Sequence, residues 1–407
     1  MNESKRVVVT GMGIISCLGN NLDDVSRSLQ QGIPGYEIDE ERIQLGFRSP
    51  LTGKIKNFET KEYLNRKRRK TMSESTIWAY AASQQAIDDA GISSELLKRD
   101  ETGIIFGHDS CAKPVVEMTD LLREEKKTMS LGSGYIFQIM DSTVTMNLST
   151  IFQTKGACWS IAGACASSAH SIGQALNLIR QGEQEIIIAG GAQEINWQVM
   201  ASFDALQAFS LNIENPQKAS RPFDRDRDGL IPSGGAAAII LERMDLAKKR
   251  GVKIYAEIID YAFSSDGEDI SIPNGEGAKL CMQKLLKKTD LNQSEIRYIN
   301  AHATSTPGGD KKEAWAIKQI FGKNSYVSST KSMTGHECWM AGAGEAIYSI
   351  LMMRDSFIAP NINFENPDED TEKIKIAASA LSFEHSYILS NSFGFGGTNA
   401  SLLFRKL

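Results

Sequence analysis

The sequence predicts an α/β protein, and three observations lead to this class. Short runs of β-branched and apolar residues alternate with longer stretches of helical periodicity, as in proteins whose strands are covered by helices. Charged residues make up 23% and hydrophobic residues 41% of the 407 positions, which fits a globular chain and excludes disordered and coiled-coil classes. A fresh strand begins after Gly251, which indicates two similar halves, residues 1–251 and 252–407, built around one core.

The individual elements follow from local patterns along the chain. Clusters of β-branched residues predict strands at residues 6–10, 102–106, 185–189, 237–241, 254–259, 297–300 and 386–389. Helical periodicity is found at residues 73–90 and 166–180. In the second of these stretches, one helical face collects the apolar residues Ala169, Ile172, Leu176 and Ile179.

Glycines after the first predicted strand resemble part of a dinucleotide-binding loop. Gly11 and Gly13 follow the strand, but the third glycine of that motif is missing, and Gly19 lies in a turn where the motif would already be helical. We therefore predict a tight turn after the first strand and no nucleotide site. The same two glycines interrupt the only N-terminal apolar stretch, so it is not a signal peptide.

Charge and cysteine content exclude several classes of function. The formal net charge of −5 argues against a nucleic-acid partner, and no apolar run approaches the ~18 residues of a membrane span. None of the six cysteines forms a CxxC pair, and no His, Cys and Asp cluster has metal-ligand spacing. We expect a cytoplasmic protein with reduced thiols.

One cysteine lies where a strand-like segment turns into a helix. Residues 159–170 read WSIAGACASSAH, so Cys165 stands among small residues directly before the predicted helix 166–180. A helix dipole stabilises a thiolate at such a position and lowers the thiol pKa, which suits a nucleophile. A small buried cysteine that only packs at a helix start is the alternative.

Two histidines and a glycine-rich segment favour the catalytic interpretation. His302 and His336 each follow a strand and stand among Ser, Thr and Gly residues, in the kind of loop that holds active sites in α/β proteins. One such histidine is more often structural, but two of them together with Cys165 are hard to explain by packing. Residues 391–399 read NSFGFGGTN, and backbone N–H groups of such a segment can form an oxyanion hole.

These motifs resemble the β-ketoacyl-acyl carrier protein synthases, the elongating condensing enzymes of the thiolase superfamily, and most of all their synthase I branch. The resemblance rests on segments that occur in order along almost the whole chain: VVVTGMGIIS, ACASSAHSIG, SRPFDRDRDGLIPSGG, HATSTP, KSMTGH, GEAIYSILMM and NSFGFGGTN. It implies the thiolase fold, in which duplicated halves form a five-layer α-β-α-β-α sandwich. It also implies a homodimer, or a heterodimer with a related subunit.

The resemblance implies a decarboxylative Claisen condensation in fatty acid or fatty-acid-like biosynthesis. Malonyl-acyl carrier protein would react with an acyl group held as a thioester on Cys165, giving 3-oxoacyl-acyl carrier protein. His302 and His336 would assist decarboxylation, and Lys331 would set the electrostatics of the site. The substrates arrive on the phosphopantetheine of acyl carrier protein, and no further cofactor is required.

Supporting roles are implied at further positions. Phe395 and Phe393 would border the oxyanion hole and gate the acyl pocket, and Glu313 would support the network of the lysine and the histidines. A structural monovalent cation is implied near Asn300, Glu345 and Asn391.

A basic run, residues 66–70 with the sequence RKRRK, is by itself either a solvated helix start or a docking surface for an acidic partner. The resemblance favours the second interpretation, because Arg66, Lys67 and Lys70 match family positions that contact the acidic carrier protein. Arg123 and Lys127 belong to a second stretch with the same implied role.

Three departures from the family concern the substrate pocket. Ala303 follows His302 where the family usually has glycine, and Trp339 replaces a small residue. Residues 107–111, which include Ser110, replace a glycine-rich segment that borders the end of the acyl pocket. We expect Ser110 and Trp339 to shape substrate choice. A ketosynthase of a type II polyketide or aryl polyene pathway is therefore an alternative.

Other classes of protein fit less well. A non-catalytic partner of the chain-length-factor type would lack Cys165. A thiolase would carry a second reactive cysteine near the C-terminus, where this chain has Gly-Phe-Gly-Gly. A starter condensing enzyme would use a catalytic set of Cys, His and Asn. The second histidine of this chain, His336, argues against that class.

Overall fold

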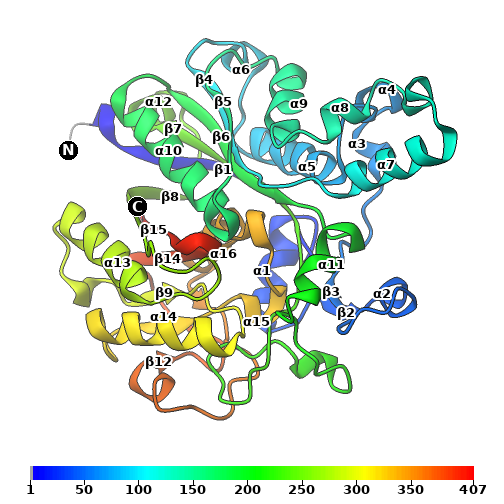
Figure 1. Cartoon of the computed structure of the whole chain (residues 1–407). Helices are drawn as coiled ribbons and strands as arrows, with labels where there is room; N and C mark the ends of the chain where they lie inside the picture. Colours follow the sequence, from blue (N-terminus) through cyan, green and yellow to red (C-terminus); the bar gives the residue numbers. More distant parts are fainter. Residues whose placement is uncertain (1–2) are drawn as a thin grey trace.

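The computed structural model describes residues 3–407. An 11-stranded sheet forms its centre, and the two halves of this sheet have the same strand order (Figure 1). The N-terminal half contains, in spatial order, β5 (Cys158–Ile161), β4 (Thr102–Gly107), β6 (Ile186–Gln193), β7 (Gly235–Arg243) and β1 (Val7–Ile15). The C-terminal half contains β10 (Tyr326–Ser328), β9 (Tyr298–Asn300), β14 (Tyr387–Gly394), β15 (Thr398–Arg405) and β8 (Ala256–Ser265), with β12 (Lys375–Ile376) beyond β10.

Strand directions repeat as well as strand order. In one half β4 is parallel to β5 and β6, and β7 is antiparallel to β6 and β1. In the other half β9 is parallel to β10 and β14, and β15 is antiparallel to β14 and β8. The halves join where β1 pairs with β8, with Val7 opposite Ile258 and Val9 opposite Ala256. The predicted duplication is confirmed.

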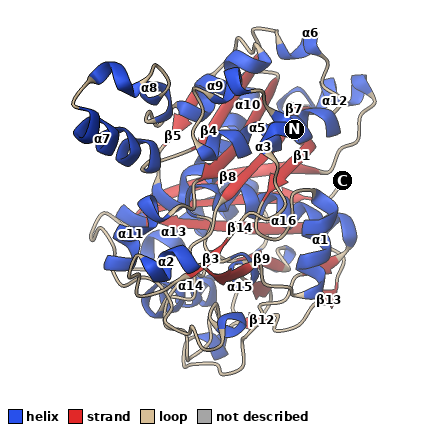
Figure 2. Ribbon diagram, turned by 90° about the vertical axis from the view of Figure 1, so that its right-hand side faces the viewer, coloured by secondary structure: helices blue, strands red, loops and turns tan. Residues whose placement is uncertain are grey.

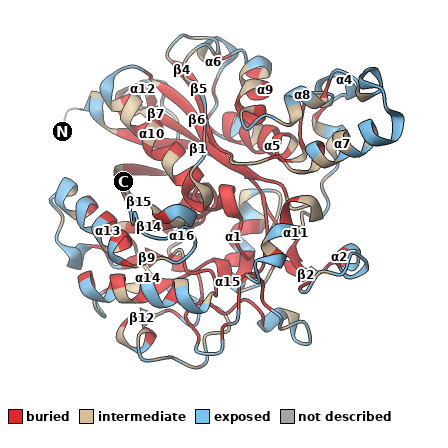
Figure 3. Ribbon diagram, viewed as in Figure 1, coloured by how far each residue is buried: buried red, intermediate tan, exposed pale blue. Residues whose placement is uncertain are grey.

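Helices separate and cover the two halves of the sheet (Figure 2). Helices α10 (Ser167–Gln181) and α16 (Ala341–Asp355) lie between the halves, and the row Ala341–Met353 of α16 is buried throughout (Figure 3). One outer face is covered by α5 (Glu74–Asp89) and α9 (Thr143–Phe152), the other by α13 (Glu276–Thr289) and α14 (Pro307–Ile320). This is the predicted five-layer α-β-α-β-α arrangement of the thiolase fold.

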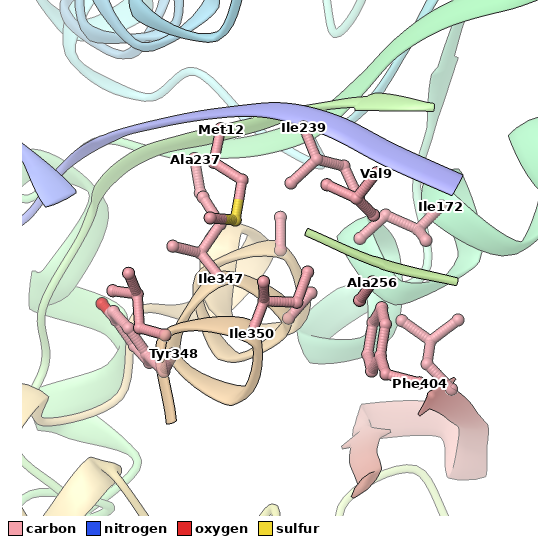
Figure 4. Close-up of a cluster of buried hydrophobic side chains, with 14 of the residues drawn as sticks. Val9, Met12, Ile172, Ala237, Ile239, Ala256, Ile347, Tyr348, Ile350 and Phe404 are labelled. Atoms are coloured by element: carbon pink, nitrogen blue, oxygen red, sulfur yellow. The ribbon is translucent and has the colours of Figure 1, made fainter. Parts of the chain in front are cut away.

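The central layer forms one core that both halves share (Figure 4). Met12 and Ile239 from the N-terminal half pack in the same cluster as Ile347, Ile350 and Phe404 from the C-terminal half. Burying this apolar surface away from water stabilises the two halves jointly. The expectation of a shared core is confirmed, while the division of the chain at residue 251 stays a prediction.

Shorter elements surround the sandwich. Small two-stranded sheets pair β2 (Tyr36–Ile38) with β3 (Leu51–Gly53) and β11 (Phe357–Ile358) with β13 (Leu381–Ser382). The remaining helices are α1 (Leu22–Gln31), α2 (Glu40–Gln44), α3 (Thr60–Tyr63), α4 (Arg66–Arg69), α6 (Ser94–Leu97), α7 (Lys113–Glu125), α8 (Tyr135–Gln138), α11 (Trp197–Ala205), α12 (Met244–Arg250) and α15 (Lys331–Thr334). In the described part of the chain, no helix has the length and apolar character needed to cross a bilayer.

The predicted turn after the first strand is wrong. β1 continues through Gly11 and Gly13 to Ile15, with a register shift between Val9 and Gly11. The glycines are needed because α5 crosses this strand closely: a Cβ at Gly13 would clash with the carbonyl oxygen of Ala82. The other predicted strands and helices are confirmed, although β6, β8 and β14 run four to six residues beyond their predicted ends.

Candidate active site

Cys165 lies in a short 3-10 turn, Ala164–Ala166, between β5 and α10. Ala164 has a φ of 45°, a left-handed conformation that costs a non-glycine residue free energy. The turn is held by Ser167, whose Oγ accepts from the Gly163 N–H at 2.9 Å and donates to the Ala164 carbonyl at 2.6 Å. The Cys165 side chain is 6% exposed, so the turn fixes an almost buried sulfur.

The thiol of Cys165 does not have the lowered pKa expected from its place before a helix. Burial raises the pKa of Cys165 to about 12, and the carboxylate of Asp109 acts in the same direction. Lys331 and the backbone N–H groups of Phe395 and Cys165 oppose this rise but do not cancel it. The expectation is wrong because loss of hydration outweighs the helix terminus when a thiolate is buried.

His302 and His336 share one cavity of about 380 Å³ with Cys165. His302 follows β9, and His336 follows α15. Their rings are 5.3 Å apart and nearly perpendicular, with an interplanar angle of 85°. The nucleophile therefore comes from the N-terminal half and both imidazoles from the C-terminal half.

Both imidazoles are neutral hydrogen-bond donors. Burial and the nearby Lys331 hold the pKa values of His302 and His336 well below the usual range. Nδ1 of His336 accepts from the Cys338 N–H at 3.3 Å, which assigns the imidazole proton to Nε2. The backbone of His336 is fixed to the preceding half of the chain, because its N–H donates to the Ile231 carbonyl at 2.7 Å.

A buried polar network supports these side chains. Lys331 forms an ion pair with Glu345 on α16, and both side chains are almost fully buried. Glu313 on α14 accepts from the His302 N–H at 3.0 Å and from Asn391 Nδ2 at 3.2 Å. Burial raises the pKa values of Glu313 and Glu345 to about 7.

A glycine-rich loop, Gly394–Gly397, closes over the nucleophile. A Cβ at Gly394 would lie 3.0 Å from the backbone N of Cys165, a tight contact that glycine avoids. Phe395 is 38% exposed at the cavity, and its ring stacks on Phe203 with centroids 6.1 Å apart. The ring of Phe393 lies 5.9 Å from that of His302.

Phe203 is a cavity residue that the sequence analysis missed. It lies on α11, and an aromatic residue in a helix gives no local signal that distinguishes a pocket wall from ordinary core. Thr304 and Thr306 also line the cavity, and their hydroxyls are 3.0 Å apart.

Ser110 and Trp339 are not among the residues that line this cavity, so their place in the substrate pocket stays a prediction. Ser110 lies in the segment between β4 and α7. Trp339 is buried, because its large ring packs into an apolar cluster with Cys165, Val199 and Phe209.

Three buried side-chain oxygen atoms, those of Asn300, Ser390 and Glu345, are of the kind that a monovalent cation binds. Within residues 3–407, both side-chain amide atoms of Asn300, Glu345 Oε2 and Ser390 Oγ have no hydrogen-bond partner. Asn300 and Ser390 are neighbours in the sheet register. The side chain of Asn391 is engaged elsewhere, with Glu313 and with Ser401, whose Oγ donates to it at 2.8 Å. The described residues contain no group of three or more His, Cys, Asp or Glu suited to a transition metal.

The predicted docking residues are exposed but lie away from the cavity. Arg66, Lys67 and Lys70 belong to α4 and its end, beside α7 and α8 (Figure 1). Arg123 and Lys127 lie at the end of α7 and just beyond it, where acidic residues are interspersed. Arg123 lies 3.9 Å from the carboxylate of Asp120, so this second stretch is less basic than α4.

Comparisons with known proteins find similarity to β-ketoacyl synthases along almost the whole chain. The sequence model of the "Beta-ketoacyl synthase, N-terminal domain" matches residues 4–247, and that of the C-terminal domain matches residues 255–365. A 3-oxoacyl-[acyl-carrier-protein] synthase 1 of Haemophilus influenzae is 42% identical over 406 residues, which covers 99% of each chain. A crystal structure of a β-ketoacyl synthase from Burkholderia phymatum has a TM-score of 0.93, 32% identity and 99% coverage of both chains. A type II polyketide ketosynthase in complex with its acyl-carrier protein has a TM-score of 0.88, 26% identity and the same coverage.

Proposed function

Because the chain belongs to the β-ketoacyl synthase family, we propose that it condenses malonyl-acyl carrier protein with an acyl group bound to Cys165. The products are carbon dioxide and 3-oxoacyl-acyl carrier protein, extended by two carbons. The observation that carries this proposal is the single cavity shared by Cys165, His302 and His336.

Acyl transfer to Cys165 comes first. The sulfur attacks the thioester carbonyl of acyl-carrier protein, a new carbon–sulfur bond forms, and the carrier leaves as a thiol that takes the proton lost by Cys165. The backbone N–H groups of Cys165 and Phe395 face the sulfur and favour negative charge there. They are the donors available to the carbonyl oxygen as it becomes an oxyanion.

Condensation follows at the histidines. The malonyl carboxylate leaves as carbon dioxide, and the electron pair of the broken bond moves onto the thioester as an enolate. His302 and His336, neutral because burial lowers their pKa values, donate hydrogen bonds to the enolate oxygen. The enolate carbon then attacks the acyl carbonyl, and Cys165 leaves as a thiolate that is reprotonated. Removing one such donor typically costs about a hundredfold or more in rate.

Replacing the nucleophile tests the proposal. Cys165→Ala should abolish both acyl loading from acyl-carrier protein and condensation with malonyl-carrier protein, measured by intact-protein mass spectrometry. Cys281→Ala is the matched control, because this buried thiol lies on α13 outside the cavity. Acyl transfer that persists in Cys165→Ala would show that another residue is the nucleophile.

A ketosynthase of a type II polyketide pathway is the second candidate. The similarity to the polyketide ketosynthase favours it, although the identity of 26% is lower than the 42% shared with the fatty acid synthase relative. Both candidates use the same chemistry at Cys165. A panel of saturated and polyketide-like acyl carriers, ranked by kcat/KM, distinguishes them.

Acyl carrier protein is the proposed partner, and α4 its proposed docking surface. Arg66, Lys67 and Lys70 present a cluster of positive charge to an acidic protein, whereas Arg123 and Lys127 contribute less because carboxylates surround them. A monovalent cation would be held by Asn300, Ser390 and Glu345, where it would stabilise the loop that carries His302. The cytoplasmic location stays a prediction.

A second copy of this chain is the proposed structural partner. β5 is the outermost strand of the N-terminal half, and among the described residues only β4 pairs with it. Trp159 on this strand is 49% exposed. An edge strand with an exposed aromatic ring is a natural site for pairing with another chain, and β5 leads directly to the turn that holds Cys165.

A further inference from the structure

Trp339 occupies the position in the C-terminal half that Cys165 occupies in the N-terminal half. Each central helix, α10 and α16, is preceded by a 3-10 turn of three residues, Ala164–Ala166 and Cys338–Met340. The first residue of each turn has a φ of 45°. The two turns contact each other. The indole of Trp339 therefore lies beside the nucleophile.

The indole packs in the same buried cluster as the nucleophile. Trp339 belongs to one apolar cluster with Cys165, Met200 and Phe209. Cys165 and Phe203 line the cavity, but Trp339, Met200 and Phe209 do not, so the cavity ends at this cluster. The rings of Phe203 and Trp339 are 6.5 Å apart. An acyl chain that extends from Cys165 into this cluster would meet these rings.

Two polar groups lie close to the turn that holds Cys165: the indole N–H of Trp339 and the carboxylate of Asp109. Trp339 is 7% exposed, and its indole N–H has no acceptor in the described part of the chain. A buried donor without an acceptor is unfavourable, and a ligand acceptor would relieve it. Asp109 is part-buried beside Cys165, with Oδ2 accepting from the Ala164 N–H at 3.0 Å.

We propose that Trp339 and Asp109 make the acyl site selective for a short acyl group that carries a hydroxyl. A hydroxyl on the acyl group either accepts from the indole N–H of Trp339 or donates to the carboxylate of Asp109. Phe203, which is part-buried between the cavity and the indole, moves aside to admit the acyl group. This inference rests on the proposed function, because it concerns the group that Cys165 carries.

The test compares acyl groups of matched length. Wild-type enzyme is assayed with butyryl-, 3-hydroxybutyryl-, 4-hydroxybutyryl- and dodecanoyl-carrier protein, and kcat/KM is measured for condensation. We expect one of the hydroxylated substrates to be used about tenfold better than butyryl, a ratio set by one charge-assisted hydrogen bond. Dodecanoyl should be the poorest substrate. Equal use of all four substrates, or a preference for dodecanoyl, overturns the proposal.

Variants separate the two roles of the indole. Trp339→Phe keeps a ring but removes the N–H, so the preference for the hydroxylated substrate should fall about tenfold without a gain for dodecanoyl. Trp339→Gly should raise kcat/KM for dodecanoyl at least tenfold. Asp109→Asn keeps an acceptor for the Ala164 N–H and should reduce the preference for a hydroxyl. Trp78→Phe is the matched control, since Trp78 has the same 7% exposure in an outer layer.

The possible failures are distinguishable. If no carrier loads Cys165, the proposed function fails. If all carriers load it and Trp339→Phe leaves the substrate ratio unchanged, only the present inference fails. Thermal unfolding of each variant identifies a protein that has not folded, and the wild-type substrate ratio decides the question without any variant.

Discussion

Cys165 shows how tertiary burial can reverse a local electrostatic argument. A helix start favours a thiolate, and small neighbouring residues allow the sharp turn, so the sequence alone predicts a lowered pKa. The structure adds almost complete burial, and burial raises the thiol pKa to about 12. The position of the nucleophile was therefore predictable, but its protonation was not, because desolvation depends on residues distant in the sequence.

The reactivity of Cys165 should therefore rise steadily with pH. Below its pKa the thiolate fraction grows about tenfold per pH unit, so alkylation of Cys165 by iodoacetamide should accelerate from pH 7 to pH 9.5 without a plateau. The rate is followed by mass spectrometry of the peptide that contains Cys165. The urea-unfolded chain is the control, in which the rate should level off above an ordinary thiol pKa of about 8.5. A plateau in the folded protein near pH 7 would contradict the raised pKa.

At the scale of elements, the valines correctly predicted where β1 begins, but the predicted strand ended five residues too early. Gly11 and Gly13 read as a turn because glycine breaks regular strands. They lie within β1 because α5 crosses it so closely that only glycine fits. The signal for this contact is tertiary, and the same holds for Phe203 and for the burial of Trp339.

Gly13→Ala tests the close crossing of β1 and α5. The added methyl group would meet the backbone of Ala82, so the free energy of unfolding should fall by about 1–3 kcal/mol, the usual cost of overpacking. Gly308→Ala is the control, because a methyl group there has open space at the start of α14. Urea unfolding measures both variants. A Gly13→Ala protein as stable as wild type would show that the strand and helix can move apart freely.

Helix α4 consists entirely of basic residues, and its charge should act on partner binding rather than on chemistry. The double variant Lys67→Glu and Lys70→Glu should raise the KM for acyl-carrier protein about tenfold or more at low salt while kcat changes little. The difference should shrink as ionic strength rises. The double variant Lys249→Glu and Lys287→Glu, at exposed positions on α12 and α13, is a control of equal charge change. An unchanged KM in the double variant would remove α4 from the docking surface.

At the scale of the whole molecule, the fold was the most predictable feature. Alternating strands and helices, and the second start near residue 252, already indicate duplicated α/β halves. The structure adds that β1 and β8 join the halves and that α10 and α16 fill the layer between them. The cavity draws Cys165 from one half and His302 and His336 from the other, so the site depends on the packing of both.

Strand β5, at the edge of the N-terminal half of the sheet, should control the formation of a dimer. Trp159→Glu places a charge on the exposed edge of β5, which should shift a dimer towards monomers at micromolar concentration, as measured by size-exclusion chromatography with light scattering. Leu280→Glu adds the same charge at a comparably exposed position on α13 and should leave assembly unchanged. A wild-type protein that is monomeric at all concentrations would contradict the proposed pairing.

The equivalence of the turns before α10 and α16 has one more consequence. Because the two halves are alike, each of them has a 3-10 turn before its central helix, and either turn could carry a catalytic side chain. In this protein one turn carries the thiol of Cys165, and the other carries the bulky indole of Trp339. A substitution of Trp339 can therefore change which acyl substrates the enzyme uses, while the turn that holds the Cys165 sulfur stays unchanged. Such an arrangement lets selectivity and reactivity evolve under separate control.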